Sequence, residues 1–149
     1  MLEQFIFANK LEAELIPCEK DVDTVKQAAA LLGCEPGDIV KSLLFIVDGE
    51  PVLALLPGDK RASEEKLLAH VQGRDARLAS PEETEEITGY AVGGVPPVSI
   101  YGVKSLLDES ILKKEWVFAG GGDNKHMLKI RVADIQLHGF EVEPADLAV

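Results

Sequence analysis

Apolar residues recur at helical spacing in the first part of the chain. Their positions over residues 2–15 predict an amphipathic helix that ends before Pro17, because the residue before a proline avoids helical backbone angles. A second helix is predicted to begin at Thr24, whose hydroxyl can cap free backbone N–H groups while Gln27 reaches back in a capping box. Gly33 predicts the end of that helix.

Two apolar, β-branched runs follow this helical region. Val40 to Val47 and Val52 to Leu56 are separated by Asp48-Gly49-Glu50-Pro51, which is turn chemistry between paired strands. The sequence therefore predicts a β-hairpin here.

Capping residues and shorter apolar runs predict the remaining elements. Ser63 begins a helix that runs to about Gln72, and Ser80-Pro81-Glu82-Glu83 begins another with a capping serine and a capping-box glutamate. Further predictions are strands over 76–79, 116–119 and 127–130 and a helix over 132–137. The coarse order expected is αβαββαβα, a loop, then ββαβ.

Glycine and proline interrupt the pattern between Gly89 and Gly102, so neither a regular helix nor a central strand is expected there. The segment is predicted to be a loop of fixed shape. Hairpins mixed with scattered helices favour an α+β fold: a mixed, largely antiparallel sheet or partly closed barrel, surrounded by helices. The 149 residues are expected to form a single domain.

Composition narrows the function classes. With 46% hydrophobic residues and no apolar run near 18 residues, the chain is expected to be globular, neither disordered nor membrane-spanning. The net charge of −11 disfavours broad binding to phosphate backbones. Residues 41–80 nevertheless carry six basic and six acidic groups, so a neutral or basic cleft in the middle of the chain stays open.

Cysteine and histidine usage predicts neither a disulfide framework nor a metal site. Cys18 and Cys34 form no CxxC motif and have no histidine at ligand spacing, and no other motif calls for a cofactor. Polar residues within the first ten positions disrupt a signal-peptide core, which makes a cytoplasmic location the expectation.

Lys41 and the segment Gly93-Gly94-Val95-Pro96-Pro97 are the candidate site. A lone cation at the head of an apolar strand either lies in water or points into a cleft, where it can hold a phosphate or stabilise negative charge on a carbonyl. The glycines permit close backbone approach to a ligand, although a purely structural turn explains them equally well. No Ser/His/Asp order or GxSxG elbow is present.

An ordered set of short motifs resembles a known family over about residues 22–146. The matching segments are Asp23-Thr24, Gly33, Val40-Lys41-Ser42-Leu43, Pro57-Gly58-Asp59, Ala79-Ser80-Pro81-Glu82-Glu83, Thr88-Gly89-Tyr90, Gly93-Gly94-Val95-Pro96-Pro97, Asp108-Glu109-Ser110 and Ala119-Gly120. Together they are similar to the YbaK/aminoacyl-tRNA synthetase-associated domain family, which also occurs as the editing insertion of bacterial prolyl-tRNA synthetases.

The resemblance implies a trans-editing deacylase that hydrolyses the ester of a mischarged aminoacyl-tRNA, with a small amino acid on proline tRNA as the expected substrate. It implies that Lys41 is central to activity and that the 93–97 loop holds the aminoacyl group through backbone atoms. A ribose hydroxyl beside the ester would assist. Thr24, Ser42 and Asp108 are implied as further substrate-binding residues, although helix capping alone would explain Thr24, and Asp108 could instead anchor the loop or have a purely structural role. The expected partners are the aminoacyl-tRNA 3′ end and a prolyl-tRNA synthetase.

Two departures from the family pattern keep an alternative open. The family loop usually reads GGxxPxG, whereas Val98 and Ser99 follow Pro97 here, and Asp23 replaces the residue that many members carry before the threonine. The alternative is a non-catalytic module that binds an aminoacyl-tRNA end or associates with a synthetase. A third reading, suggested by the net charge of −11, is an acidic interaction protein with no small-molecule site.

Overall fold

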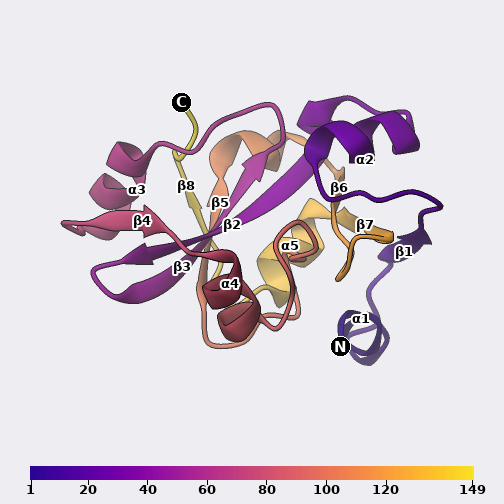
Figure 1. Ribbon diagram of the computed structural model, residues 1–149, viewed down its shortest axis with the longest axis horizontal. Coiled ribbons are helices and arrows are strands. Elements are labelled where there is room, and N and C mark those ends of the chain that lie inside the picture. The colour runs from indigo at the N-terminus through magenta and orange to yellow at the C-terminus, as the bar shows by residue number, and fades with distance from the viewer.

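The computed structural model describes all 149 residues and contains one eight-stranded sheet with helices around it (Figure 1). The helices are α1 (Leu2–Ala8), α2 (Val25–Leu32), α3 (Glu64–Val71), α4 (Pro81–Thr88) and α5 (Val132–His138), with 3-10 turns η1 (Pro36–Asp38) and η2 (Glu109–Lys113). The strands are β1 (Glu14–Pro17), β2 (Ile39–Val47), β3 (Glu50–Pro57), β4 (Ala76–Leu78), β5 (Lys104–Asp108), β6 (Trp116–Gly120), β7 (His126–Arg131) and β8 (Glu143–Ala145). None of the helices has the length and apolarity that crossing a bilayer requires.

The sheet is mixed and stays open. Its order is β1-β7-β6-β2-β3-β5-β8, with β4 added to β2. Four of the strand pairings are antiparallel and three are parallel. The predicted α+β class with a largely antiparallel sheet is confirmed, and of the two predicted forms the structure adopts the open sheet.

One edge of β2 is shared by two other strands. Ile39 and Val40 pair with β6, whereas residues 45–47 pair with β4. In Figure 1, α2 lies near β6 at one end of β2, and α3 lies with β4 at the other end. Residues 41–44 therefore lie in the interval between β6 and β4.

The predicted hairpin of β2 and β3 is confirmed, with Val40 opposite Pro57 and Val47 opposite Glu50. Asp48 and Gly49 both have positive φ, 49° and 83°. Two such residues make the tight turn whose twist suits a hairpin, and glycine and aspartate tolerate that conformation well.

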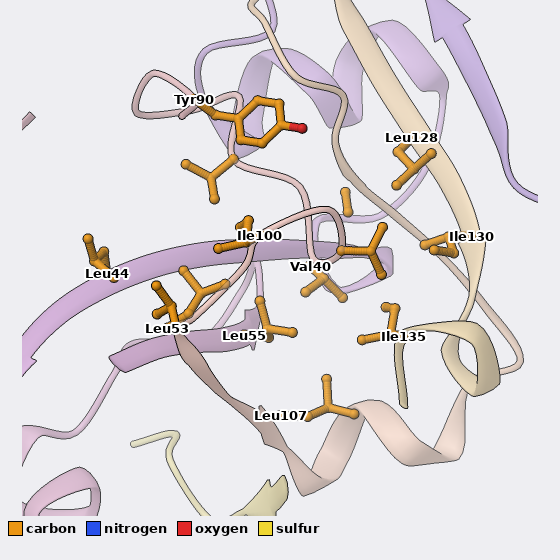
Figure 2. Close-up of a cluster of buried hydrophobic side chains, with 14 of the residues drawn as sticks. Val40, Leu44, Leu53, Leu55, Tyr90, Ile100, Leu107, Leu128, Ile130 and Ile135 are labelled. Atoms are coloured by element: carbon orange, nitrogen blue, oxygen red, sulfur yellow. The ribbon is translucent and has the colours of Figure 1, made fainter. Parts of the chain in front are cut away.

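The sheet is covered on both faces, as expected for a strand that reads as a continuous apolar run. Leu53 and Leu55 of β3 belong to the larger core with α5 and the 89–103 loop, whereas Ala54 and Leu56 belong to a second cluster with α3. Figure 2 shows the larger core, in which Val40 and Leu44 of β2 lie among side chains from β3, β5, β7 and α5. Burial on both faces makes this hairpin a rigid frame.

Side-chain caps begin three helices where the sequence predicts them. Thr24, Ser63 and Ser80 each accept a hydrogen bond from the backbone N–H three residues later. The reciprocal glutamine or glutamate contact completes a capping box at Thr24 and Ser80. The loop prediction between Gly89 and Gly102 is also confirmed, since neither a helix nor a strand lies there.

Two expectations about the elements were wrong. The helix predicted over 2–15 ends at Ala8, and Lys10 has φ of 54°, which no helix can accommodate. The chain then becomes β1, because residues 14–17 pair with β7 more than a hundred positions later. Strand β5 was missed altogether, although it pairs in parallel with β3 and carries the fully buried Leu106 and Leu107.

Candidate functional site

A pocket of about 190 Å³ opens beside the stretch of β2 that lies between β6 and β4. Its walls come from β2, from α2 and the segment before it, from the 89–103 loop and from β6 and β7. The lining residues are Val22, Asp23, Thr24, Val25, Ala28, Ile39, Val40, Lys41, Ser42, Leu43, Val92, Gly93, Val95, Gly120 and Met127. Most of them are apolar, so the few polar groups stand out.

Lys41 lines the pocket as a partly buried cation with no carboxylate in ion-pair contact. Burial lowers the pKa of its ammonium below the ordinary value, while the charge of Asp59 opposes that change and the charge of Arg61 adds to it. The cleft reading of Lys41 is therefore the one that the structure supports. An ammonium that has lost water and gained no close partner is suited to an anionic ligand atom.

Ser42 contributes a hydroxyl that has no partner. Its Oγ is buried, and it is the buried side-chain polar atom of the chain without a hydrogen bond. Native structures rarely leave such an atom unsatisfied, and the exceptions call for an explanation. Because Ser42 also lines the pocket, a bound ligand can supply the missing hydrogen bond.

Thr24 has a structural role and also lines the pocket. Its Oγ1 accepts a 3.1 Å hydrogen bond from the backbone N–H of Gln27, which starts α2, and Ala28 on the first turn lies in the same wall. The cap thereby fixes where α2 begins and how its apolar face meets the pocket.

The glycine-rich loop contributes Gly93 and Val95 to the lining. Gly93 has φ of 90°, and a Cβ added there would lie 2.8 Å from the backbone oxygen of Asp23. Only glycine allows this approach between the loop and the segment before α2. Val95 continues the wall, with its side chain in the main core.

The other predicted loop residues lie behind this surface. Gly94, Pro96 and Pro97 are buried and do not line the pocket. Gly94 accepts a 2.8 Å hydrogen bond from the N–H of Gly122, which ties the loop to the turn between β6 and β7. These residues therefore support the wall from behind.

Asp108 is located away from the pocket. Its Oδ1 accepts hydrogen bonds from the backbone N–H groups of Leu147, at 2.9 Å, and Ala148, at 3.1 Å, while its Oδ2 accepts from Ser110. With both oxygens occupied at the end of β5, the carboxylate holds the C-terminal segment in place. The structure does not bring Asp108 together with Lys41.

The two loop departures also point away from the pocket. Val98 and Ser99 are 1% and 5% exposed, and the Ser99 Oγ lies 2.9 Å from the hydroxyl of Tyr90. Neither side chain forms part of the lining.

Several lining residues were not found by reading the sequence. Gly120 and Met127 come from β6 and β7, about eighty residues after Lys41, and only the pairing of β6 with β2 places them at the pocket. Gly120 was signalled by the Ala119-Gly120 motif, but it had no assigned role. Met127 and Val22 carry no signal beyond apolarity.

The arrangement combines a desolvated cation, an unpartnered hydroxyl and an apolar hollow. A cation in such a place stabilises negative charge more strongly than it would in water. No group of three or more His, Cys, Asp or Glu residues is arranged to hold a metal ion. The fold and the site define an α+β domain with a small, mostly apolar pocket that is lined by one lysine and by one hydroxyl without a partner.

Comparison with known proteins identifies the class more closely. The family model of the aminoacyl-tRNA editing domain matches residues 19–137. The chain belongs to the aminoacyl-tRNA editing domain family.

Its relatives include proline–tRNA ligases. That of Nitratidesulfovibrio vulgaris is 36% identical over 109 residues, covering 72% of this chain and 19% of the ligase. That of Lactobacillus acidophilus is 37% identical over 108 residues, covering 72% and 19%. The chain thus spans about a fifth of the length of these relatives.

Solved structures extend the similarity to the whole chain. A protein described as a candidate trans-editing enzyme for prolyl tRNA synthetase shares 33% identity at a TM-score of 0.85, covering 99% of this chain and 92% of the other. A hypothetical protein shares 31% identity at a TM-score of 0.89, with 99% of both chains covered. The domain is related to prolyl-tRNA synthetase editing.

Proposed function

We propose that this protein is a trans-editing deacylase that hydrolyses the ester between a wrongly attached amino acid and the terminal ribose of a tRNA. The observation that carries the proposal is Lys41, a partly buried ammonium without an ion-pair partner, which lines a small, mostly apolar pocket together with Gly93. The family and the resemblance to a protein described as acting in trans for prolyl tRNA synthetase support the same reading.

The proposed reaction is addition of water to the ester carbonyl. Negative charge develops on the carbonyl oxygen, where the Lys41 ammonium stabilises it. The bond from the carbonyl carbon to the ribose oxygen then breaks, the ribose oxygen takes up a proton, and the amino acid and the free tRNA end are the products. The neighbouring ribose hydroxyl orients or activates the water, so the protein needs no nucleophilic side chain.

The size of the pocket favours a small amino acid. Its volume of about 190 Å³ lies below the ~300 Å³ at which pockets for drug-sized ligands begin. An aminoacyl group with a short side chain fits such a space, while the adenosine and the rest of the tRNA stay outside. Because proline–tRNA ligases are relatives, proline tRNA carrying a small wrong amino acid is the proposed substrate.

A panel of mischarged tRNAs tests this proposal. Proline tRNA carrying alanine, serine or proline, and alanine tRNA carrying alanine, are incubated with the wild type and with Lys41→Ala. We expect release of a small amino acid from proline tRNA by the wild type, with the Lys41→Ala variant strongly impaired. Equal release by both proteins would refute the role of Lys41.

The alternative is a non-catalytic module that binds an aminoacyl-tRNA end. This alternative was suggested by Val98 and Ser99, which depart from the family pattern. Both side chains are buried and do not line the pocket. Turnover on any member of the panel rejects this alternative. Tight binding of an amide-linked aminoacyl-adenosine by the wild type, without hydrolysis of any mischarged tRNA, would establish it and would redirect the search toward a synthetase partner.

A further inference from the structure

The loop that walls the pocket begins and ends at two buried hydroxyl groups. Tyr90 and Ser99 are each 5% exposed, and their side-chain oxygens lie 2.9 Å apart. The backbone N–H of Tyr90 also donates to the Thr88 hydroxyl at 3.1 Å, so the start of the loop is fixed to the end of α4. In Figure 2 the Tyr90 ring lies beside the buried cluster that contains Ile100.

Ser99 adopts a backbone conformation that favours glycine. Its φ is 69°, in the left-handed region, although it has a side chain and is buried. A serine stays there only when its surroundings hold it. The Ser99 hydroxyl has one side-chain partner, which is Tyr90.

Each of these hydroxyls satisfies the other. Burial raises the pKa of Tyr90, so the phenol stays neutral and can donate or accept at physiological pH. If either hydroxyl is removed, the other is left buried without this partner, an arrangement that proteins avoid. The contact closes the ten-residue segment 90–99, which contains Val92, Gly93 and Val95, the loop residues that line the pocket.

We propose that the Tyr90–Ser99 hydrogen bond is a latch that positions the Gly93 wall of the pocket, and that Ser99 makes the wall depend on Tyr90. Both are positioning residues, since neither lines the pocket. The inference rests on the proposed function only where enzymatic activity is measured. The mobility of the loop can be measured without any substrate.

Four variants test the latch: Tyr90→Phe, Ser99→Gly, the double variant, and Tyr101→Phe as the matched control. Tyr101 lies outside the 90–99 segment that the contact closes and is 72% exposed, so loss of its hydroxyl is expected to change nothing. The readouts are KM and kcat for the mischarged tRNA released fastest by the wild type, hydrogen exchange of the amides at 91–95, and the melting temperature.

For Tyr90→Phe we expect amide exchange at 91–95 to rise about tenfold and KM to rise about fivefold with kcat within twofold, because an unlatched wall spends less time in the binding geometry. Ser99→Gly also removes the hydrogen bond, but glycine adopts the positive φ at this position without strain. We therefore expect smaller changes in exchange and KM for Ser99→Gly than for Tyr90→Phe. The double variant lacks the same hydrogen bond as Tyr90→Phe, so its exchange and KM should rise to a similar extent, and the effects of the two substitutions should not add.

A Tyr90→Phe variant that melts earlier but keeps wild-type exchange at 91–95 and wild-type KM overturns the latch, since the contact would then be structural only. Wild-type exchange and KM in the double variant overturn it as well, since the effect of Tyr90→Phe would then come from the orphaned Ser99 hydroxyl and not from the lost hydrogen bond. If the wild type hydrolyses no mischarged tRNA, the proposed function fails, and the exchange data alone still decide whether Tyr90 and Ser99 hold the wall.

Discussion

The two ends of β2 differ in burial and in role: residues 44–47 belong to the buried core, and residues 41–43 line the pocket. Residues 44–47 are buried and pair with β3, and at 45–47 also with β4. Residues 41–43 are only partly buried, line the pocket, and include a desolvated ammonium and an unpartnered hydroxyl. The comparison shows that one strand can carry part of the buried core and, a few residues earlier, part of the pocket lining.

The largest expected effect is on the pocket half. Lys41→Met keeps the length of the side chain but removes the charge, and kcat/KM for deacylation should fall by about 10²- to 10³-fold, as when an oxyanion-stabilising donor is lost. The matched control is Lys129→Met, which changes a partly buried lysine of β7 whose Nζ lies 5.3 Å from the centre of the Trp116 ring of β6. Similar losses in both variants would show that Lys41 has no special role.

The second-largest effect is expected from a substitution in the buried part of β2, residues 44–47. Leu44→Ala removes a side chain that is 3% exposed and should lower the free energy of unfolding by about 3 kcal/mol. KM of the folded fraction should stay unchanged, since Leu44 does not line the pocket. Leu43→Ala, one residue earlier, should cost about 1 kcal/mol because the side chain is only partly buried, and should alter KM. Urea unfolding measures the loss of stability, and steady-state kinetics measure KM. A changed KM in Leu44→Ala with an unchanged KM in Leu43→Ala would contradict the division of β2 into a buried part and a pocket part.

Two helix caps extend the comparison beyond β2. Thr24→Ala and Ser63→Ala each remove a hydroxyl that accepts an N-terminal backbone N–H, so each should cost about 1 kcal/mol of stability. Only Thr24 lines the pocket, so only Thr24→Ala should also weaken binding of an amide-linked aminoacyl-adenosine, measured by calorimetry. If both variants bind this analogue equally well, the role of Thr24 is limited to capping α2.

The smallest effect concerns the charge of Lys41 and pH. Because burial lowers the pKa of Lys41 in the folded state, the charged lysine destabilises the fold at every pH below that lowered value, and the penalty is lost as pH rises past the ordinary value of 10.5. Lys41→Met should therefore be more stable than the wild type at pH 7 by a few tenths of a kcal/mol after solvent screening. The urea midpoints of the wild type and Lys41→Met, measured at pH 7, 9 and 10.5, should converge as the pH rises. A difference that stays constant with pH would show that the gain in stability comes from packing instead.

Elements with local signals were predictable from sequence, and elements held by distant partners were not. The capping box at Thr24 and the turn at Asp48-Gly49 are complete within a few residues, and both occur as predicted. By contrast, β1 forms through its pairing with β7, and apolar spacing alone extended the predicted first helix over residues 14 and 15. Strand β5 lies between β3 and β8, where burial replaces alternation, so its sequence carries no period-two pattern.

The site divides in the same way. Lys41 stood out because a cation is unusual at the head of an apolar strand, and the glycines at 93 and 94 because they interrupt regular structure. The role of Asp108 could not be decided from sequence, because its partners, the N–H groups of Leu147 and Ala148, lie about forty residues further along the chain. Chemistry that depends on side-chain type is readable from sequence; chemistry that depends on which backbone groups arrive nearby requires the fold.

The parallel pairing of Ile39 and Val40 with β6 has a consequence for when the site comes into being. It joins segments about eighty residues apart, the kind of contact that forms slowly and late in folding. The β2–β3 hairpin can form early from neighbouring residues, but Gly120 and Met127 close the pocket only after that distant strand has docked. During synthesis, Lys41 therefore emerges and folds into its hairpin well before the chain has a site in which to use it.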